Sequence, residues 1–225
     1  MIDFDFALAR RSMVDSQVRT SDVTDMRLIT AMLKVPRERF VPPEQAALAY
    51  LDRDVLAASA SGGRPARRLL KPMVFARLLQ AAEIAANDHV LDVGCATGYS
   101  SAIIAHLTNS VVALEEDPAL ADAARTNVSS LGLTQIEVVT GPLVEGHPKG
   151  APYDVIVLEG AFEVAPKSLV HQLKPGGRLV GVSGRGPNGK AMLFYRVDGD
   201  SGGRPIFDAA APLLPGFSAP TEFVF

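Results

Sequence analysis

Cysteine is almost absent from this sequence of 225 residues, in which Cys95 is the only one. A single cysteine cannot form an internal disulfide, and this favours a reducing compartment. The four histidines do not share a zinc-like spacing with that cysteine. They are His89, His106, His147 and His171. We therefore expect no metal site.

Long apolar runs and an excess of basic residues are missing as well. No segment approaches the roughly 18 apolar residues of a membrane-spanning helix. The net charge is −3, so no general attraction to phosphate groups or anionic lipids is expected. Asp3 and Asp5 lie where a signal peptide has its apolar stretch. These absences predict a cytoplasmic protein whose partners include neither nucleic acid nor a membrane.

What the sequence does have is a regular alternation of short apolar runs with helix-like segments. This pattern predicts an α/β fold with a doubly wound, mostly parallel sheet covered by helices on both faces. We expect residues 1–71 to form a helical N-terminal region, with a helix over 23–34, and residues 72–225 to form the α/β domain of one globular unit. Near the end, 190–199 and 221–225 read as strands of an antiparallel edge hairpin, and "DGDSGGRPI" between them as a loop.

The stretch "LDVGCATGYSSA" is the strongest functional signal. Gly94 and Gly98 stand between a predicted strand and a predicted helix, where glycine lets the backbone approach a ligand and the first helical N–H groups are free. Asp92 precedes them, and Glu115 follows at the end of the next strand, placed to accept both hydroxyls of a ribose. The spacing predicts an adenosine ligand, and the alternative is a bare tight turn.

The glycine spacing also discriminates among adenosine cofactors. Residues 94–99 read G-C-A-T-G-Y and lack the second and third glycines of the dinucleotide fingerprint. An acid two residues before the first glycine, with another glycine four residues on, is typical of S-adenosylmethionine enzymes. The sequence "GRGPNG" at 184–189 does match the fingerprint, but a strand-like segment follows it, which predicts a hairpin loop.

Several motifs together resemble one family, the protein-L-isoaspartate O-methyltransferases. They are "MVDSQV", "VPRERFVP", "VLDVGCATGYSSA", "ALEEDPAL", "GPLVEG", "APYDVIVLEGA" and "LKPGGRLV", in family order. The resemblance implies a Rossmann-like methyltransferase that binds S-adenosylmethionine, releases S-adenosylhomocysteine and methylates the free carboxylate of isoaspartyl residues in damaged proteins. The cofactor residues that it implies are Asp92, Gly94, Cys95, Ala96, Gly98, Tyr99, Ser100, Glu115, Glu116, Gly141, Pro142, Leu143 and Glu159.

The chain departs from the family pattern at three positions. Ala96 replaces a glycine, and its methyl group is tolerable where the backbone is not in a glycine-only conformation. Pro142 replaces an aspartate that reaches the adenine, which leaves main-chain atoms near Leu143 for that contact. Leu70 replaces the serine whose hydroxyl lies at the substrate site, so the catalytic position has lost a hydrogen-bond donor.

The loss at Leu70 affects positioning, because a carboxylate is already ionised at neutral pH and needs no base. A desolvated carboxylate without its donor costs roughly 1 to 3 kcal/mol. Arg67, Arg68 and Lys71 stand beside this position. They either pair with the substrate carboxylate or are solvated surface charges.

Glu159 is the second unusual residue at the predicted catalytic centre, where the family has small uncharged side chains. It could act as base or acceptor for an amine or hydroxyl nucleophile and would repel a carboxylate, or it is a solvated strand-end acid. Cys95 is either a reactive thiol or a packing residue. Two alternatives to isoaspartyl methylation therefore stay open: transfer to a small molecule or another protein group, and a non-catalytic module that binds S-adenosylmethionine.

Overall fold

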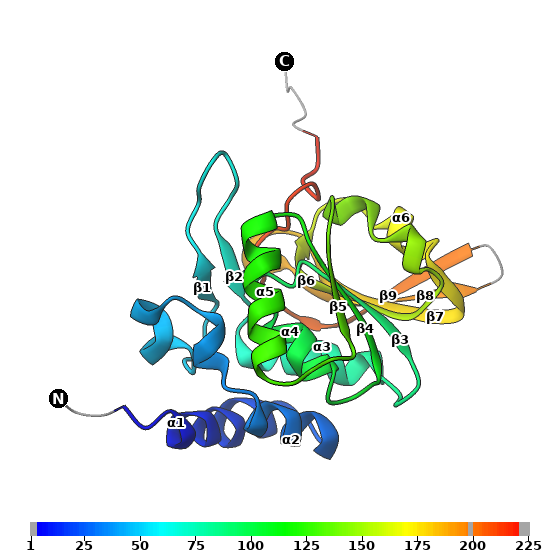
Figure 1. Ribbon diagram of the computed structural model, residues 1–225. Helices are drawn as coiled ribbons and strands as arrows, with labels where there is room; N and C mark the ends of the chain where they lie inside the picture. The colour runs from blue at the N-terminus through cyan, green and yellow to red at the C-terminus, as the bar shows by residue number, and fades with distance from the viewer. Residues whose placement is uncertain (1–3, 198–199, 221–225) are drawn as a thin grey trace.

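The computed structural model describes residues 4–197 and 200–220, and its centre is a seven-stranded sheet (Figure 1). The strands lie in the order β5-β4-β3-β6-β7-β8-β9. β3, β4, β5, β6 and β7 are parallel, and β8 and β9 extend the sheet antiparallel. The strand bounds are β3 (His89–Val93), β4 (Ser110–Glu115), β5 (Ile136–Thr140), β6 (Tyr153–Phe162), β7 (Leu173–Ser183), β8 (Lys190–Val197) and β9 (Asp200–Asp208). The predicted doubly wound sheet with an antiparallel edge is confirmed.

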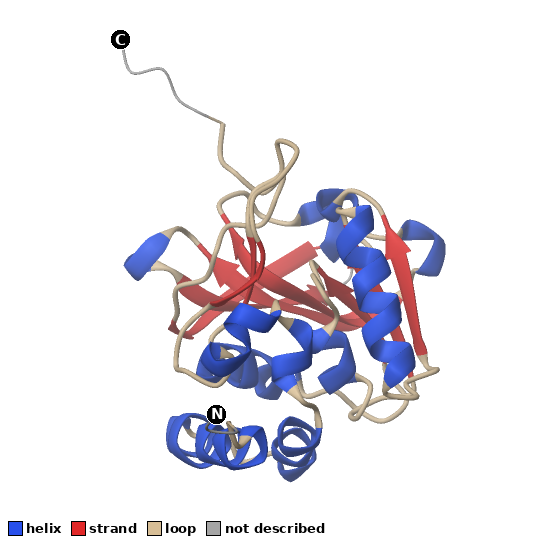
Figure 2. Cartoon of the chain, turned by 60° about the vertical axis from the view of Figure 1, so that its left-hand side comes forward, coloured by secondary structure: helices blue, strands red, loops and turns tan. Residues whose placement is uncertain are grey.

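Alternating side chains of the central strands enter two separate cores, because successive residues of a strand point to opposite faces. In β3, Val90 belongs to one core and Leu91 to the other. The first core packs against α3 (Pro72–Ala82) and α4 (Tyr99–Ile104). The second packs against α6 (Lys167–Val170). Figure 2 shows helices on both sides of the sheet.

The helix α5 (Pro118–Ser130) follows β4 and packs beside β4 and β5. Its start is specified locally, since Pro118 occupies the first turn and the carboxylate of Asp117 accepts the N–H of Ala119 at 2.9 Å. Only two residues separate this start from the end of β4. One edge of the sheet is therefore formed by the ends of β3, β4 and β6 together with the starts of α4 and α5. In this architecture ligands bind at such an edge.

The N-terminal region contains α1 (Phe6–Met13), which continues into a π-helix over Val14–Val18, and α2 (Met26–Lys34). Both helices lie below α3 and α4 in Figure 1. The predicted helix over 23–34 is confirmed for residues 26–34, and it begins three residues later than predicted because Asp25 is its N-cap. Buried residues of these helices join the same core as α3, so the N-terminal region and the α/β domain share one core.

The N-terminal region is not entirely helical. A two-stranded antiparallel sheet forms from β1 (Val55–Ala58) and β2 (Arg67–Leu69), and the sequence analysis did not predict it. Its pairing brings Leu69 opposite Val55, and both side chains are buried. The strand β2 ends immediately before the position of Leu70, so this small sheet carries the residues predicted to face the substrate.

The C-terminal prediction was partly wrong. Residues 200–206 belong to the expected loop over 198–206 but lie in β9, which pairs with β8. The predicted strand over 221–225 lies outside the described residues. The sequence "GRGPNG" does connect β7 to β8 as the predicted hairpin loop. No helix in the part of the chain described here is long and apolar enough to span a membrane.

Candidate active site

The loop between β3 and α4 is built around two glycines with positive φ. Gly94 has φ +83°, and its N–H donates to the carbonyl of Leu114 at 2.8 Å. Gly98 has φ +94° at the start of α4, and a Cβ there would lie 3.2 Å from the Cβ of Ala124 on α5. Both positions therefore favour glycine through conformation, and the second also through close packing.

Ala96 lies in the same loop with φ +50°, in the left-handed helical region. An alanine can adopt this conformation at a cost of about 1 kcal/mol, so the replacement of the family glycine is tolerated. The conformation directs the N–H of Ala96 to Oε2 of Glu115, 2.8 Å away. This hydrogen bond links the loop to the end of β4.

Asp92, at the end of β3, is completely buried. Its Oδ2 accepts hydrogen bonds from the hydroxyl groups of Ser100 at 2.7 Å and Ser101 at 2.5 Å. Its Oδ1 has no hydrogen-bond partner within the described ranges. Burial raises the pKa of Asp92 to about 6, and the two serine hydroxyls oppose this rise. Ser101 was not predicted, although it follows Ser100 at the start of the same helix.

Glu115, at the end of β4, is fully buried and already surrounded by donors from the chain itself. Its Oε1 lies 2.6 Å from Nη1 of Arg67 and also accepts the N–H groups of Glu116 and Asp117. Nη2 of Arg67 donates to the carbonyl of Gly94 at 2.9 Å. The sequence analysis placed Arg67 beside the substrate or in solvent. The structure places its guanidinium on the carboxylate expected to bind the ribose.

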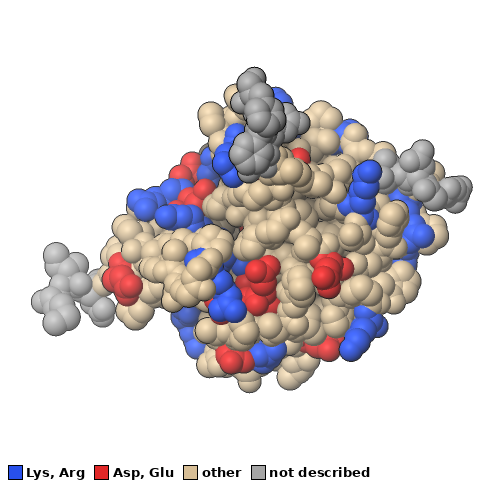
Figure 3. Space-filling model, turned by 90° about the horizontal axis from the view of Figure 1, so that it is seen from above, with Lys and Arg blue, Asp and Glu red and all other residues tan. Residues whose placement is uncertain are grey.

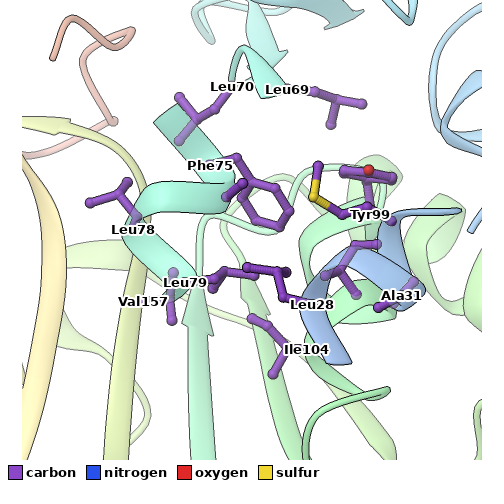
Figure 4. Packing of buried hydrophobic residues seen from close by; sticks show 14 of the residues in the cluster. Leu28, Ala31, Leu69, Leu70, Phe75, Leu78, Leu79, Tyr99, Ile104 and Val157 are labelled. Atoms are coloured by element: carbon purple, nitrogen blue, oxygen red, sulfur yellow. The ribbon is translucent and has the colours of Figure 1, made fainter. Parts of the chain in front are cut away.

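A narrow cavity of about 10 Å³ lies between the glycine loop and the residues that follow β2. Leu70 and Glu159 both line it, although they are 89 positions apart in the sequence. Figure 4 shows Leu69 and Leu70 above the ring of Phe75, with Tyr99 beside it. The structure therefore brings the two predicted catalytic positions to one wall of the same cavity.

Arg37 is a residue of this site that sequence reasoning missed. It is 1% exposed, and its Nε and Nη2 donate to the carbonyls of Ala49 and Leu70, both at 2.7 Å. Its guanidinium lies over the ring of Tyr99, 4.6 Å from the centroid. Arg37 therefore fixes the backbone at Leu70 and places a positive charge beside the cavity. The motif "VPRERF", already part of the family resemblance, was the signal that could have identified it.

Glu159 is half-buried near the end of β6, and its Oε1 is covered and without a partner among the residues the structure describes. Burial raises the pKa of Glu159 well above its ordinary value, and the negative charge of Asp92 adds to the rise. Arg37 and Arg67 act in the opposite direction. The hydroxyl of Tyr99 is also covered and has no hydrogen-bond partner in the described part of the chain. Glu159 is thus neither a solvated acid nor part of an ion pair.

The remaining predicted residues lie around this centre. Gly141 donates its N–H to the carbonyl of Glu115 at 3.1 Å, and Pro142 begins the 3₁₀ turn that contains the buried Leu143. The side chain of Leu143 belongs to the same core as Leu214. A Cβ on Gly94 would lie 2.9 Å from Leu214, so the C-terminal segment packs against the glycine loop.

Arg68, Lys71 and Cys95 differ in exposure. Arg68 is exposed at the cavity wall, and Lys71 is half-buried, with its N–H donating to Asp54 at 2.9 Å. Cys95 is buried, and burial raises the pKa of its thiol well above the ordinary value. The surroundings of Cys95 favour the packing role over the reactive one.

The donor set of this site fits S-adenosylmethionine at its methionine end. The unpaired Oδ1 of Asp92 needs a hydrogen-bond donor, which an ammonium group supplies. The cavity as it stands has room for about one water molecule. Binding of a nucleoside at Glu115 therefore requires the guanidinium of Arg67 to move away from Oε1.

Comparison with known sequences places these residues in a family context. The family described as protein-L-isoaspartate(D-aspartate) O-methyltransferase (PCMT) matches residues 9–201. A protein-L-isoaspartate O-methyltransferase of Methanoculleus marisnigri is 39% identical over 171 residues, which cover 76% of this chain and 75% of the relative. One of Koribacter versatilis is 39% identical over 175 residues, covering 78% and 76%.

Two solved structures have the same fold. One is described as a protein-L-isoaspartate O-methyltransferase, with TM-score 0.78 and 24% identity over 92% of this chain and 66% of its own. The other is a putative protein-L-isoaspartate O-methyltransferase from Plasmodium falciparum in complex with S-adenosyl-L-homocysteine, with TM-score 0.75 and 17% identity over 91% and 97%. The Rossmann-like methyltransferase architecture is thereby confirmed.

Proposed function

Because the chain belongs to the protein-L-isoaspartate O-methyltransferase family, we propose that it transfers the methyl group of S-adenosylmethionine to the free carboxylate of isoaspartyl residues in proteins or peptides. The observation that carries this proposal is the arrangement of Asp92, Glu115 and the loop between them at one edge of the sheet. These are the residues that the family resemblance assigns to the cofactor.

The chemistry requires little beyond positioning. An isoaspartyl carboxylate has a pKa near 4 and is ionised at neutral pH, so the chain needs no general base. The cofactor, when bound, supplies an electrophilic methyl group on a sulfonium. Asp92 offers an unpaired oxygen, Glu115 offers a carboxylate to a ribose, and Leu70 with Arg37 bounds the space where the acceptor would enter. Each group orients a reactant, and orientation is the main contribution such a transfer needs.

We also propose a cytoplasmic protein whose macromolecular partner is the damaged polypeptide, with neither nucleic acid nor a membrane as a partner. Two observations support this. The thiol of Cys95 is buried. On the face drawn in Figure 3, acidic and basic side chains are interspersed among uncharged residues, which does not favour binding to a phosphate backbone.

Transfer to an amine or hydroxyl of a small molecule or another protein group is the second candidate. It is favoured by Glu159, a carboxyl group at the predicted methyl position. An ionised Glu159 would repel a substrate carboxylate and could take a proton from a neutral nucleophile.

Incubation with isoaspartyl and aspartyl forms of one peptide and methyl-labelled cofactor tests the proposal. We expect a base-labile methyl ester on the isoaspartyl form and little on the aspartyl form. Base-stable label on an amine would support the second candidate. Binding of S-adenosylhomocysteine without transfer to either peptide or to small acceptors would indicate a non-catalytic binding module.

A further inference from the structure

We propose that Glu159 binds the isoaspartyl carboxylate through a protonated carboxyl group, and so replaces the hydroxyl that is absent at Leu70. This inference rests on the proposed function and adds a substrate-positioning residue to it. It assigns to Glu159 the opposite role from that of a base, because the carboxyl group donates a hydrogen bond and keeps its proton throughout the transfer.

The geometry supplies the first argument. Leu70 follows β2 and Glu159 lies near the end of β6, yet both line the same cavity. Leu70 is 2% exposed and offers no donor. The hydroxyl of Ser100, which also lines the cavity, is already donated to Asp92. The carboxyl group of Glu159, which lines the same cavity as Leu70, is therefore placed to serve a ligand that reaches this cavity.

The hydrogen-bond inventory supplies the second argument. Oε1 of Glu159 is covered and has no partner within residues 4–197 and 200–220, and buried polar atoms are normally paired. The side chain is nevertheless half-buried overall, so it can be reached from outside. A ligand with a matching polar group would satisfy this carboxyl group. The hydroxyl of Tyr99 also lines the cavity and has no hydrogen-bond partner among the described residues, so a Tyr99 variant serves as a control.

Protonation follows from the charges that face Glu159. Asp92 of β3 and Tyr99 of α4 interact electrostatically with Glu159, and so do the guanidinium groups of Arg37 and Arg67 from the N-terminal region. Burial and Asp92 raise the pKa of Glu159 well above its ordinary value, and the two arginines only partly oppose this. The pKa of Asp92 itself is about 6. The negative charge of Asp92 therefore favours the protonated form of Glu159.

A carboxylic acid can donate to one oxygen of a substrate carboxylate and leave the other oxygen free to attack the methyl group. An ionised Glu159 would instead repel the same carboxylate. The hydrogen bond from Glu159 to the substrate carboxylate is thus present at pH values below the pKa of Glu159 and is lost as pH rises through that pKa. The substrate carboxylate, with its pKa near 4, contributes no change in this range.

The test measures kcat and KM from pH 6 to 9.5 on an isoaspartyl peptide with blocked termini and no Lys, Tyr, Cys or His. Wild-type protein should lose kcat/KM about tenfold per pH unit above the pKa of Glu159. Glu159→Gln keeps a donor that does not titrate, so it should retain activity within about threefold at pH 7 and lack that alkaline decline. Glu159→Leu should lose roughly tenfold to a hundredfold, chiefly through KM.

Three further variants complete the test. The double variant Leu70→Ser/Glu159→Leu should recover activity, because it restores a hydroxyl. Glu163→Gln removes a carboxylate that pairs with Arg185, and it should keep the wild-type pH profile. Tyr99→Phe should keep the alkaline decline.

The proposal is overturned if Glu159→Gln is as inactive as Glu159→Leu while both bind S-adenosylhomocysteine, because a base or a purely structural carboxylate would behave so. It is also overturned if Glu159→Leu is as active as wild type, or if Glu159→Gln keeps the alkaline decline. Wild-type protein that makes no ester on the isoaspartyl peptide at any pH would refute the proposed function itself, and this inference with it.

Discussion

The guanidinium of Arg67 and the carboxylate of Glu115 form a buried ion pair, with Nη1 2.6 Å from Oε1, at the position expected for a ribose. The pair joins β2 to the end of β4, and a second bond from Arg67 reaches the carbonyl of Gly94. A nucleoside that binds Glu115 therefore competes with a donor of the chain itself. We therefore predict that cofactor binding and the position of β2 are coupled.

Substitution of Arg67 tests this competition. Arg67→Leu leaves a buried carboxylate unpaired, and we expect the free energy of unfolding to fall by about 3 kcal/mol without ligand. We also expect S-adenosylhomocysteine to bind roughly tenfold more tightly, since no ion pair has to be broken first. Denaturant unfolding and calorimetric titration measure the two effects. Arg68→Leu, at the exposed neighbour, is the matched control and should change neither the stability nor the affinity. Weaker binding of S-adenosylhomocysteine by Arg67→Leu would contradict the account.

Asp92 should make the unliganded protein less stable as pH rises. Its pKa is raised to about 6 by burial, whereas the unfolded chain has an ordinary aspartate. The stabilising contribution of the protonated form is complete below about pH 4 and is lost as pH rises to about 6, by about 3 kcal/mol in total. Urea unfolding of wild type and Asp92→Asn across pH 4 to 7.5 measures this. In Asp92→Asn the free energy of unfolding should not show this decrease with pH. An equal decrease in both proteins would refute the raised pKa of Asp92.

Cys95 should be unreactive in the folded protein. It is buried, and burial raises the pKa of its thiol well above the ordinary value, so the reactive thiolate is scarce at neutral pH. A thiol-specific chromogenic disulfide at pH 7.5 should label it slowly in buffer and release one equivalent promptly in urea. Prompt labelling of the native protein would contradict this prediction and indicate that Cys95 is a reactive residue.

Leu70 should matter more to stability than to catalysis. It is 2% exposed and lies above Phe75 (Figure 4), so Leu70→Ser should lower the free energy of unfolding by about 3 kcal/mol. Because Glu159 supplies the donor, kcat/KM on an isoaspartyl peptide should change by less than about threefold. A gain of a hundredfold or more would mean that nothing replaces the family hydroxyl. Leu69→Ser, at a similarly buried neighbour, is the control for the stability change.

The sequence predicted those parts of the fold that local patterns specify. Helices follow β3, β4 and β6, and each parallel strand contains a short apolar run, so periodicity predicts a parallel sheet. The turn at Gly94 and Gly98 could be predicted because positive φ favours glycine. These features need no knowledge of distant contacts.

Features that depend on distant contacts were missed or misassigned. Gly203 lies in the segment predicted as a loop, but in β9 it is paired with Phe194. A Cβ at this position would lie 2.5 Å from Cε1 of the Phe194 ring, so strand packing requires glycine here. Arg67 was expected either to pair with the substrate or to be a surface charge, and no role was predicted for Arg37. They are buried because carbonyl or carboxylate groups 12 to 48 residues away accept their hydrogen bonds. Sequence spacing alone contains no sign of such pairings.

The central claim is that the crevice between Asp92 and Glu115 binds the nucleoside of S-adenosylmethionine. Calorimetric titration with S-adenosylhomocysteine of wild-type protein and of Glu115→Gln tests it most directly. The account predicts a single site with micromolar affinity in the wild type and binding at least about tenfold weaker in the variant. Equal affinity in both proteins, or no binding to either, would contradict it.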